Sequence, residues 1–150
     1  MLLAQKHIFI VEDNRQNRVV FKMALIRHGA LVEFEKWGHD SAQRLKELAQ
    51  ADLVILDLML AYGISGLDVF DEIRAIPRFQ QVPIIAVSAM DPALAIPKVQ
   101  LKGFAAFIAK PIDIATFPEQ VARVMSGERL WASAVAPVSE YPAEHQNTEK

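Results

Sequence analysis

Four of the five short apolar runs in this sequence are followed by polar side chains that could share one site. Glu12 and Asp13 come directly after the first run, and Asp57 comes directly after the third. Ser88 follows the fourth run, and Lys110 comes shortly after the fifth. If these runs are neighbouring strands, the chain delivers three carboxylates, a hydroxyl and an amine to one edge of a sheet.

Carboxylates that share a pocket repel one another unless a cation neutralises them. Mg²⁺ suits this task because it prefers oxygen ligands and keeps waters or phosphate oxygens in its shell. With a metal held by Glu12 or Asp13 and by Asp57, the free oxygen of Asp57 can attack a phosphoryl group and form an aspartyl phosphate. Lys110 and Ser88 would then contact the phosphoryl oxygens. The spacing therefore predicts a phosphoryl acceptor that works with Mg²⁺.

The elements that must position these residues are short strands alternating with helices. The apolar runs cover residues 8–11, 31–34, 53–56, 84–87 and 104–108. Three of these runs are nearly continuous in Val, Ile, Leu or Phe, which is typical of parallel strands buried on both faces. Helical patterns begin after Asn14 and recur at residues 39–50, 66–76, 92–102 and from 113 or 116 onward. The alternation predicts a doubly wound α/β fold, and the common order 2-1-3-4-5 would make the first and third strands neighbours.

Two helical segments carry specific local predictions. In the first, Val19, Met23 and Ile26 fall at helical spacing, which predicts that they form the apolar stripe of the helix. In the last, Thr116 and Glu119 have the spacing of a capping box, which would begin a helix at this point.

Composition excludes several classes of protein. Of the 150 residues, 52% are hydrophobic and 23% are charged, which indicates one globular domain. A net charge of −2 argues against direct nucleic-acid binding, and the absence of cysteine excludes disulfides and thiolate metal sites. No apolar run is long enough to span a membrane. We expect a cytoplasmic domain at residues 1–130, followed by a flexible tail at 131–150.

The set of site residues resembles the receiver domain of bacterial response regulators, over about residues 6–127. That family carries an acidic pair, an acceptor aspartate, a Ser or Thr followed by a small residue, and a Lys-Pro pair; the matching residues here are Glu12–Asp13, Asp57, Ser88–Ala89 and Lys110–Pro111. The resemblance implies that the Met59 carbonyl joins the magnesium shell and that Phe107 is the switch aromatic. It also implies a cis bond before Pro111.

The resemblance further implies the partners. A phosphohistidine on a histidine kinase or phosphotransfer protein would donate to Asp57, and the signal would leave through contacts with a protein target. Such a domain catalyses only its own phosphorylation and dephosphorylation. Because the stretch after Trp131 is too short for an effector domain, the sequence is similar to a stand-alone receiver.

Three positions depart from the family pattern. Ala61 replaces a usual proline, Gly66 lies nine rather than eight residues after Asp57, and Pro97 interrupts the fourth helical segment. The altered loop leaves open a second hypothesis, a pseudo-receiver that binds proteins without taking phosphate. A haloacid-dehalogenase-like phosphatase is disfavoured because the D-x-D pattern is missing after the first run. A flavodoxin-like flavin protein is disfavoured because no Ser/Thr-rich loop follows that run.

Overall fold

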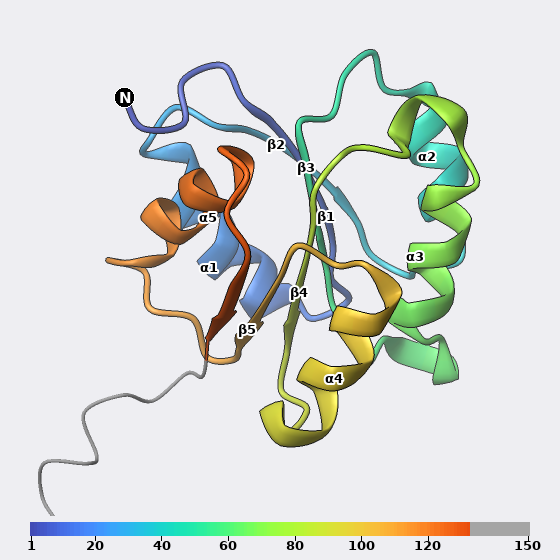
Figure 1. The fold of residues 1–150 in the computed structure, drawn as a ribbon. Coiled ribbons are helices and arrows are strands. Elements are labelled where there is room, and N and C mark those ends of the chain that lie inside the picture. Colours follow the sequence, from blue (N-terminus) through green and yellow to red (C-terminus); the bar gives the residue numbers. More distant parts are fainter. Residues whose placement is uncertain (133–150) are drawn as a thin grey trace, which may run out of the picture.

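A parallel sheet forms the centre of the computed structural model, which describes residues 1–132 (Figure 1). The strands follow the spatial order β2-β1-β3-β4-β5-β6. Their bounds are β1 His7–Val11, β2 Leu31–Glu35, β3 Leu53–Leu56, β4 Ile84–Ser88, β5 Ala106–Ala109 and β6 Leu130–Ala132. The predicted fold class and the order of the first five strands are confirmed. The predicted tail lies outside the described residues, apart from its first two positions.

Helices cover both faces of the sheet. The α-helices are α1 Arg15–Ile26, α2 Ser41–Glu47, α3 Gly66–Arg74, α4 Pro92–Lys102 and α5 Phe117–Met125, and two short 3₁₀ helices are η1 Ala61–Gly63 and η2 Pro77–Phe79. In Figure 1, α1 and α5 lie on one face, and α2, α3 and α4 lie on the other. Each face buries its own apolar cluster, because successive strand residues point to opposite sides. None of the helices in residues 1–132 has the length and hydropathy needed to cross a membrane.

The sheet contains one strand more than the sequence predicted. Strand β6 runs parallel to β5, and helix α5 makes the crossover between them. Strand β6 is only three residues long, which is too short to show a periodic pattern, so it could not be predicted from the sequence. The predicted boundary between domain and tail at residue 131 therefore falls within a strand.

The predicted apolar stripe of helix α1 is wrong. Val19, Met23 and Ile26 are 49%, 56% and 42% exposed, and the helix instead buries Phe21, Ala24 and Leu25. The two sets lie on different sides of the helix, and both have helical spacing. Phe21 decides the orientation, since its ring packs 5.7 Å from that of Phe117 on α5.

Two predictions about helix ends and interruptions also need correction. Helix α4 continues through Pro97, which lies on the exposed side of the helix. The backbone carbonyl that receives no hydrogen bond from this proline can therefore bond to water. Ala95 and Val99 on the opposite side are buried and hold this helix to the sheet. At the start of α5, Thr116 occupies the N-cap position, but its side chain makes no capping hydrogen bond. Its backbone is helical there, with φ −100° and ψ −19°, so the capping box does not form.

Candidate functional site

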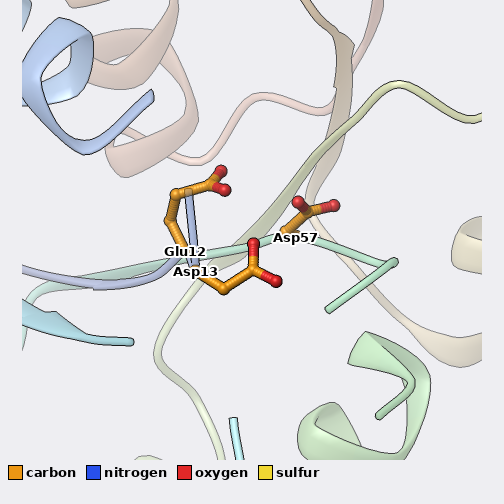
Figure 2. A group of neighbouring side chains, drawn as sticks. All are labelled: Glu12, Asp13 and Asp57. Carbon is orange, nitrogen blue, oxygen red and sulfur yellow. The ribbon is translucent and has the colours of Figure 1, made fainter. Parts of the chain in front are cut away.

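Three carboxylates meet at the carboxyl ends of β1 and β3. These strands pair directly, with Val11 opposite Leu56, so Glu12 and Asp13 emerge beside Asp57. Each residue offers a carboxylate oxygen that lies within 4.8 Å of the others (Figure 2). Glu12 and Asp57 are buried, and Asp13 is partly exposed. The structure thus brings together the three acidic residues that sequence reasoning selected as metal ligands.

Glu12 is held by the first turn of helix α1. Its Oε2 accepts a hydrogen bond from the backbone N–H of Asn14 at 3.1 Å and a longer one from Nδ2 of Asn17 at 3.5 Å. Arg18 donates to the Glu12 backbone carbonyl at 3.1 Å. Sequence reasoning missed both Asn17 and Arg18. The signal was present in their spacing from the N-cap Asn14. Residues three and four positions further along share one side of a helix.

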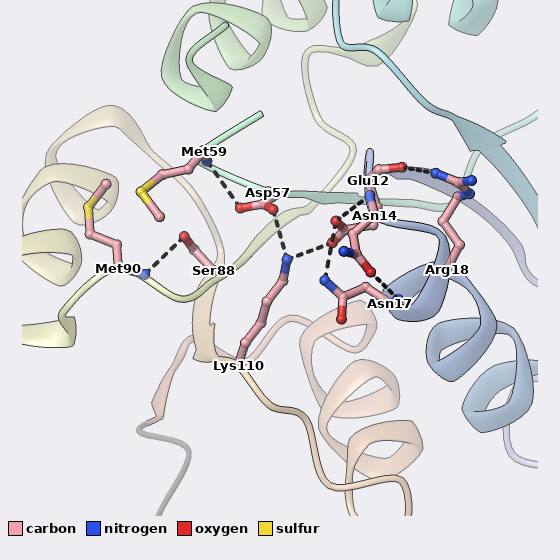
Figure 3. Close-up of polar contacts among 9 residues, drawn as sticks. All are labelled: Glu12, Asn14, Asn17, Arg18, Asp57, Met59, Ser88, Met90 and Lys110. Atoms are coloured by element: carbon pink, nitrogen blue, oxygen red, sulfur yellow. Dashed lines mark hydrogen bonds and ion pairs between the residues drawn. The ribbon is translucent and has the colours of Figure 1, made fainter. Parts of the chain in front are cut away.

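Lys110 reaches into the acidic pocket from the end of β5. Its Nζ lies 2.8 Å from Oδ2 of Asp57 and 2.7 Å from Oε1 of Glu12 (Figure 3). Burial alone would lower the pKa of Lys110, but hydrogen bonding and attraction from the two carboxylates hold that pKa above its ordinary value. The lysine is therefore a fixed positive charge that partly balances the three acids.

Glu12 nevertheless keeps unused binding capacity. Burial raises its pKa above the ordinary value, and the attraction of Lys110 offsets only part of that effect. Its buried Oε1 lies 2.7 Å from Nζ of Lys110 and has no further hydrogen-bond partner within the described part of the chain. A carboxylate oxygen has two lone pairs, so Oε1 can still accept a cation, and together with the other two carboxylates it offers the oxygen ligands that a hydrated Mg²⁺ prefers. The residues present fit that ion.

Asp57 is fixed by the loop that follows it. Its Oδ1 accepts a hydrogen bond from the backbone N–H of Met59 at 3.1 Å. The loop closes behind Met59 through a bridge to Ser65, and the N–H of Gly66 donates to the Leu58 carbonyl at 2.9 Å. A Cβ at Gly66 would collide with the Asp57 carbonyl oxygen, so this position requires glycine. The glycine that departs from family spacing in sequence still packs directly against the acceptor.

The tip of this loop is the short 3₁₀ helix η1. Tyr62 has a left-handed backbone with φ 60°, is 85% exposed, and lies with its ring 6.0 Å from that of Trp37. Gly38 packs closely against Leu60, which joins the β2–α2 loop to the β3–α3 loop. The tip of the loop is therefore exposed at Tyr62, whereas its base beside Asp57 is closed.

The remaining predicted site residues lie on the other side of the pocket. Ser88 ends β4, is fully buried, and accepts a hydrogen bond from the Met90 N–H at 3.2 Å. Ala89 follows it and is exposed. The peptide bond between Lys110 and Pro111 is cis. Phe107 is fully buried within the cluster that faces α3 and α4, so this structure shows the aromatic already turned inward.

The fold and this set of side chains define a receiver domain. The sequence profile described as the response regulator receiver domain matches residues 8–122. The chain belongs to that family.

Individual relatives agree with this assignment. The chain is 28% identical over 123 residues to the transcriptional regulatory protein AfsQ1 of Streptomyces coelicolor, an alignment that covers 81% of this chain and 52% of AfsQ1. It therefore spans about half the length of that relative. The polar-differentiation response regulator DivK of Brucella ovis is 28% identical over 116 residues, which cover 77% of this chain and 93% of DivK.

A solved structure supports the fold. The receiver domain of the sensor histidine kinase PA1611 from Pseudomonas aeruginosa PAO1 is 27% identical, with a TM-score of 0.72. The match covers 83% of this chain and all of that domain, which was crystallised with a magnesium ion in its active-site cleft. The acidic cluster described here lies at the carboxyl ends of the corresponding central strands of this fold.

Proposed function

We propose that this chain accepts a phosphoryl group from a phosphohistidine onto Asp57 and then signals through protein contacts. The observation that carries the proposal is the convergence of Glu12, Asp13, Asp57 and Lys110 in one pocket. A pseudo-receiver would not need these four charges. Three carboxylates exceed the single positive charge of Lys110, so they repel one another in the resting protein, and a bound cation would offset that repulsion.

The reaction is a transfer between two nucleophiles. A carboxylate oxygen of Asp57 forms a bond to phosphorus, the bond between phosphorus and the histidine nitrogen breaks, and that nitrogen keeps the electron pair. Met59 orients the carboxylate through its N–H, and Lys110 neutralises charge on the transferred group. The Ser88 hydroxyl and the backbone N–H of Ala89 are the remaining donors on the side of β4.

Mg²⁺ would be held by Glu12, Asp13, Asp57 and the backbone carbonyl of Met59. When bound, it supplies positive charge to the oxygens of the phosphoryl group. The protein itself contributes the alignment of the acceptor and the charge of Lys110. The chain thereby catalyses only its own phosphorylation and the later hydrolysis of the acyl phosphate.

The surface beside the pocket suits a protein donor. Helix α1 presents the exposed stripe Val19, Met23 and Ile26, and it contains three basic residues and no acidic one. This surface, which we call the α1 face, adjoins a hollow that reaches Lys110 and Pro111. A donor that brings its histidine to Asp57 would cover this surface, and an apolar ridge with acidic margins would fit it.

The proposal is tested by phosphorylation with acetyl phosphate, a small donor that needs no docking surface. Wild-type protein with Mg²⁺ should gain one phosphate by intact mass, and Asp57→Asn should gain none. Asp68→Asn, an exposed carboxylate on α3, is the matched control and should behave as wild type. Excess chelator should stop the reaction. Phosphate on Asp57→Asn at the wild-type rate would show that the acceptor lies elsewhere.

A further inference from the structure

Glu35 is a buried carboxylate that the proposed reaction does not use. It ends strand β2 and is only 2% exposed. Its Oε1 accepts hydrogen bonds from the Gly38 N–H and the Ser41 hydroxyl, both at 2.6 Å. Its Oε2 accepts a hydrogen bond from the Trp37 N–H at 2.8 Å. All three donors belong to the β2–α2 loop or to the first residue of α2, so this one side chain fixes the shape of that loop.

The charge of Glu35 makes this attachment a strong one. Within residues 1–132 no lysine, arginine or histidine forms an ion pair with it. A carboxylate buried without a counter-ion depends on its hydrogen bonds to offset the loss of water. Hydrogen bonds to a charged acceptor are roughly twice as strong as those between neutral groups. Three such bonds therefore hold the loop to the end of β2 more firmly than the same bonds to a neutral amide would.

The β2–α2 loop in turn packs against the loop that follows the acceptor. A Cβ at Gly38 would lie 2.8 Å from Cδ1 of Leu60 and 3.1 Å from Cγ2 of Ile64, so the Gly38 backbone lies directly against these two side chains. The Leu60 N–H donates to the Ile64 carbonyl at 3.1 Å, and Met59 pairs with Ser65 immediately inside them. The β2–α2 loop thus supports the closed base of the β3–α3 loop from outside.

The main chain of Glu35 contacts the other half of the site. The Glu12 N–H donates to the Glu35 carbonyl at 3.1 Å. One half of the predicted metal site follows β1 and begins with Glu12, and the other half follows β3 and comprises Asp57 and Met59. Glu35 is therefore linked to the first half through its carbonyl and to the second half through its carboxylate and the loop that this carboxylate holds.

We propose that Glu35 is a positioning residue for the metal and phosphoryl site, which it holds in shape by anchoring Gly38 against Leu60. The inference rests on the proposed function, because the site that Glu35 positions is the one assigned to Mg²⁺ and the phosphoryl group. It goes further because β2 carries none of the predicted site residues. When the anchor is lost, the N–H and the carbonyl of Met59 lose their fixed places beside Asp57, although every residue of the site is still present.

Magnesium binding measures the effect on the site. Glu35→Gln keeps the size of the side chain but replaces an acceptor oxygen by an NH₂ group, so one side of the anchor faces donor against donor. A Mg²⁺ titration followed by amide NMR should show an affinity about fivefold lower than that of the wild type. This loss is smaller than the tenfold or more expected when a direct partner of a metal ligand is removed.

Glu33→Gln is the matched control for the charge. Glu33 lies on the same strand, its side chain is 58% exposed, and the substitution changes the net charge by the same amount. This variant should bind Mg²⁺ as the wild type does. Equal weakening in Glu33→Gln and Glu35→Gln would show that the lost charge is responsible, and it would overturn the anchor.

Hydrogen exchange tests the anchor in the resting protein, without Mg²⁺ or phosphate. In Glu35→Gln, peptides that cover residues 58–66 should exchange about tenfold faster than in the wild type, whereas peptides of the central strand β4 should keep their protection. Ser41→Ala is a milder variant, because it removes one donor and leaves the carboxylate. It should raise exchange in the same peptides by a smaller factor. Unchanged exchange at residues 58–66 in both variants would overturn the inference.

A double-mutant cycle separates positioning from a general stabilising role. Leu60→Ala removes the contact of Gly38 from the opposite side and leaves Glu35 untouched. If Glu35 acts through this contact, Glu35→Gln/Leu60→Ala should bind Mg²⁺ no more weakly than Leu60→Ala alone. Losses that multiply in the double variant would mean that each residue stabilises only its own loop, and the positioning role would fall.

The outcomes also separate this inference from the proposed function. Phosphate on wild-type Asp57, together with unchanged Mg²⁺ affinity and unchanged exchange in Glu35→Gln, would overturn the role of Glu35 and leave the acceptor in place. Failure of acetyl phosphate to modify the wild type would overturn the proposed function. Exchange at residues 58–66 would then still decide whether Glu35 anchors the loop.

Discussion

Helices α1 and α5 lie side by side on the same face of the sheet, yet they use their apolar residues in opposite ways. Helix α5 buries its stripe of Phe117, Val121 and Val124 in the core. Helix α1 has an equally regular stripe that it leaves exposed, and it packs through Phe21 and its neighbours instead. Apolar residues at helical spacing therefore show that a helix has an apolar side. That side can pack against the core of the domain or against another protein.

The largest expected difference between the two helices is in stability. Phe117→Ala should lower the free energy of unfolding by about 3–5 kcal/mol, because it leaves a cavity under the sheet. Met23→Ala should change it by less than about 0.5 kcal/mol, because the side chain is already 56% exposed. Urea unfolding followed by circular dichroism measures both. A loss of several kcal/mol in Met23→Ala would mean that the α1 face belongs to the core.

The next effect concerns transfer from a protein donor. Met23→Asp should slow transfer about tenfold or more, which corresponds to ~1.4 kcal/mol, because it places a charge in the apolar centre of the α1 face. The donor is the histidine phosphotransfer protein that phosphorylates the wild type fastest in a panel. The rate with acetyl phosphate should stay unchanged. Equal slowing with both donors would point to damage in the pocket rather than to a docking surface.

The smallest effect separates the charges of the two helices. Lys22→Glu on α1 should slow transfer from the same protein donor a few-fold at low salt, and the difference should shrink as salt rises. Arg123→Glu on α5 is the matched charge reversal. It breaks an exposed ion pair with Glu128, which contributes at most about 1 kcal/mol to stability. Its transfer rate should equal that of the wild type, so equal slowing in both variants would mean that the docking surface extends to α5.

The sequence predicted the parts of the molecule that depend on strand ends. Because parallel strands bring their carboxyl ends to one edge, the positions of Glu12, Asp57 and Lys110 relative to apolar runs were enough to predict that they meet. The strand order is the common one for this fold class and does not follow from spacing, and it is confirmed for the first five strands. The prediction of the site depends on where polar residues stand relative to the apolar runs, and those positions can be read directly from the sequence.

Other features depend on contacts between distant segments, which spacing does not record. The orientation of α1 is set by the contact of Phe21 with Phe117, almost a hundred residues away. Strand β6 is stabilised by Leu130 and Trp131, which pack against apolar clusters on opposite sides of the sheet. Three residues are too few to show a periodic pattern in the sequence. The rule that proline interrupts a helix also failed at Pro97. Helix α4 continues there because its buried residues Ala95 and Val99 hold it to the sheet.

The closed base of the β3–α3 loop has a consequence for how this domain tolerates change in chain length. Gly66 cannot move from the Asp57 carbonyl, and Met59 and Ser65 pair just above it. An added or deleted residue is therefore absorbed at Ala61–Gly63, where a Cβ on Gly63 would meet only open space. That tip is a natural position for grafting a short peptide or a reporter group beside the acceptor without shifting it.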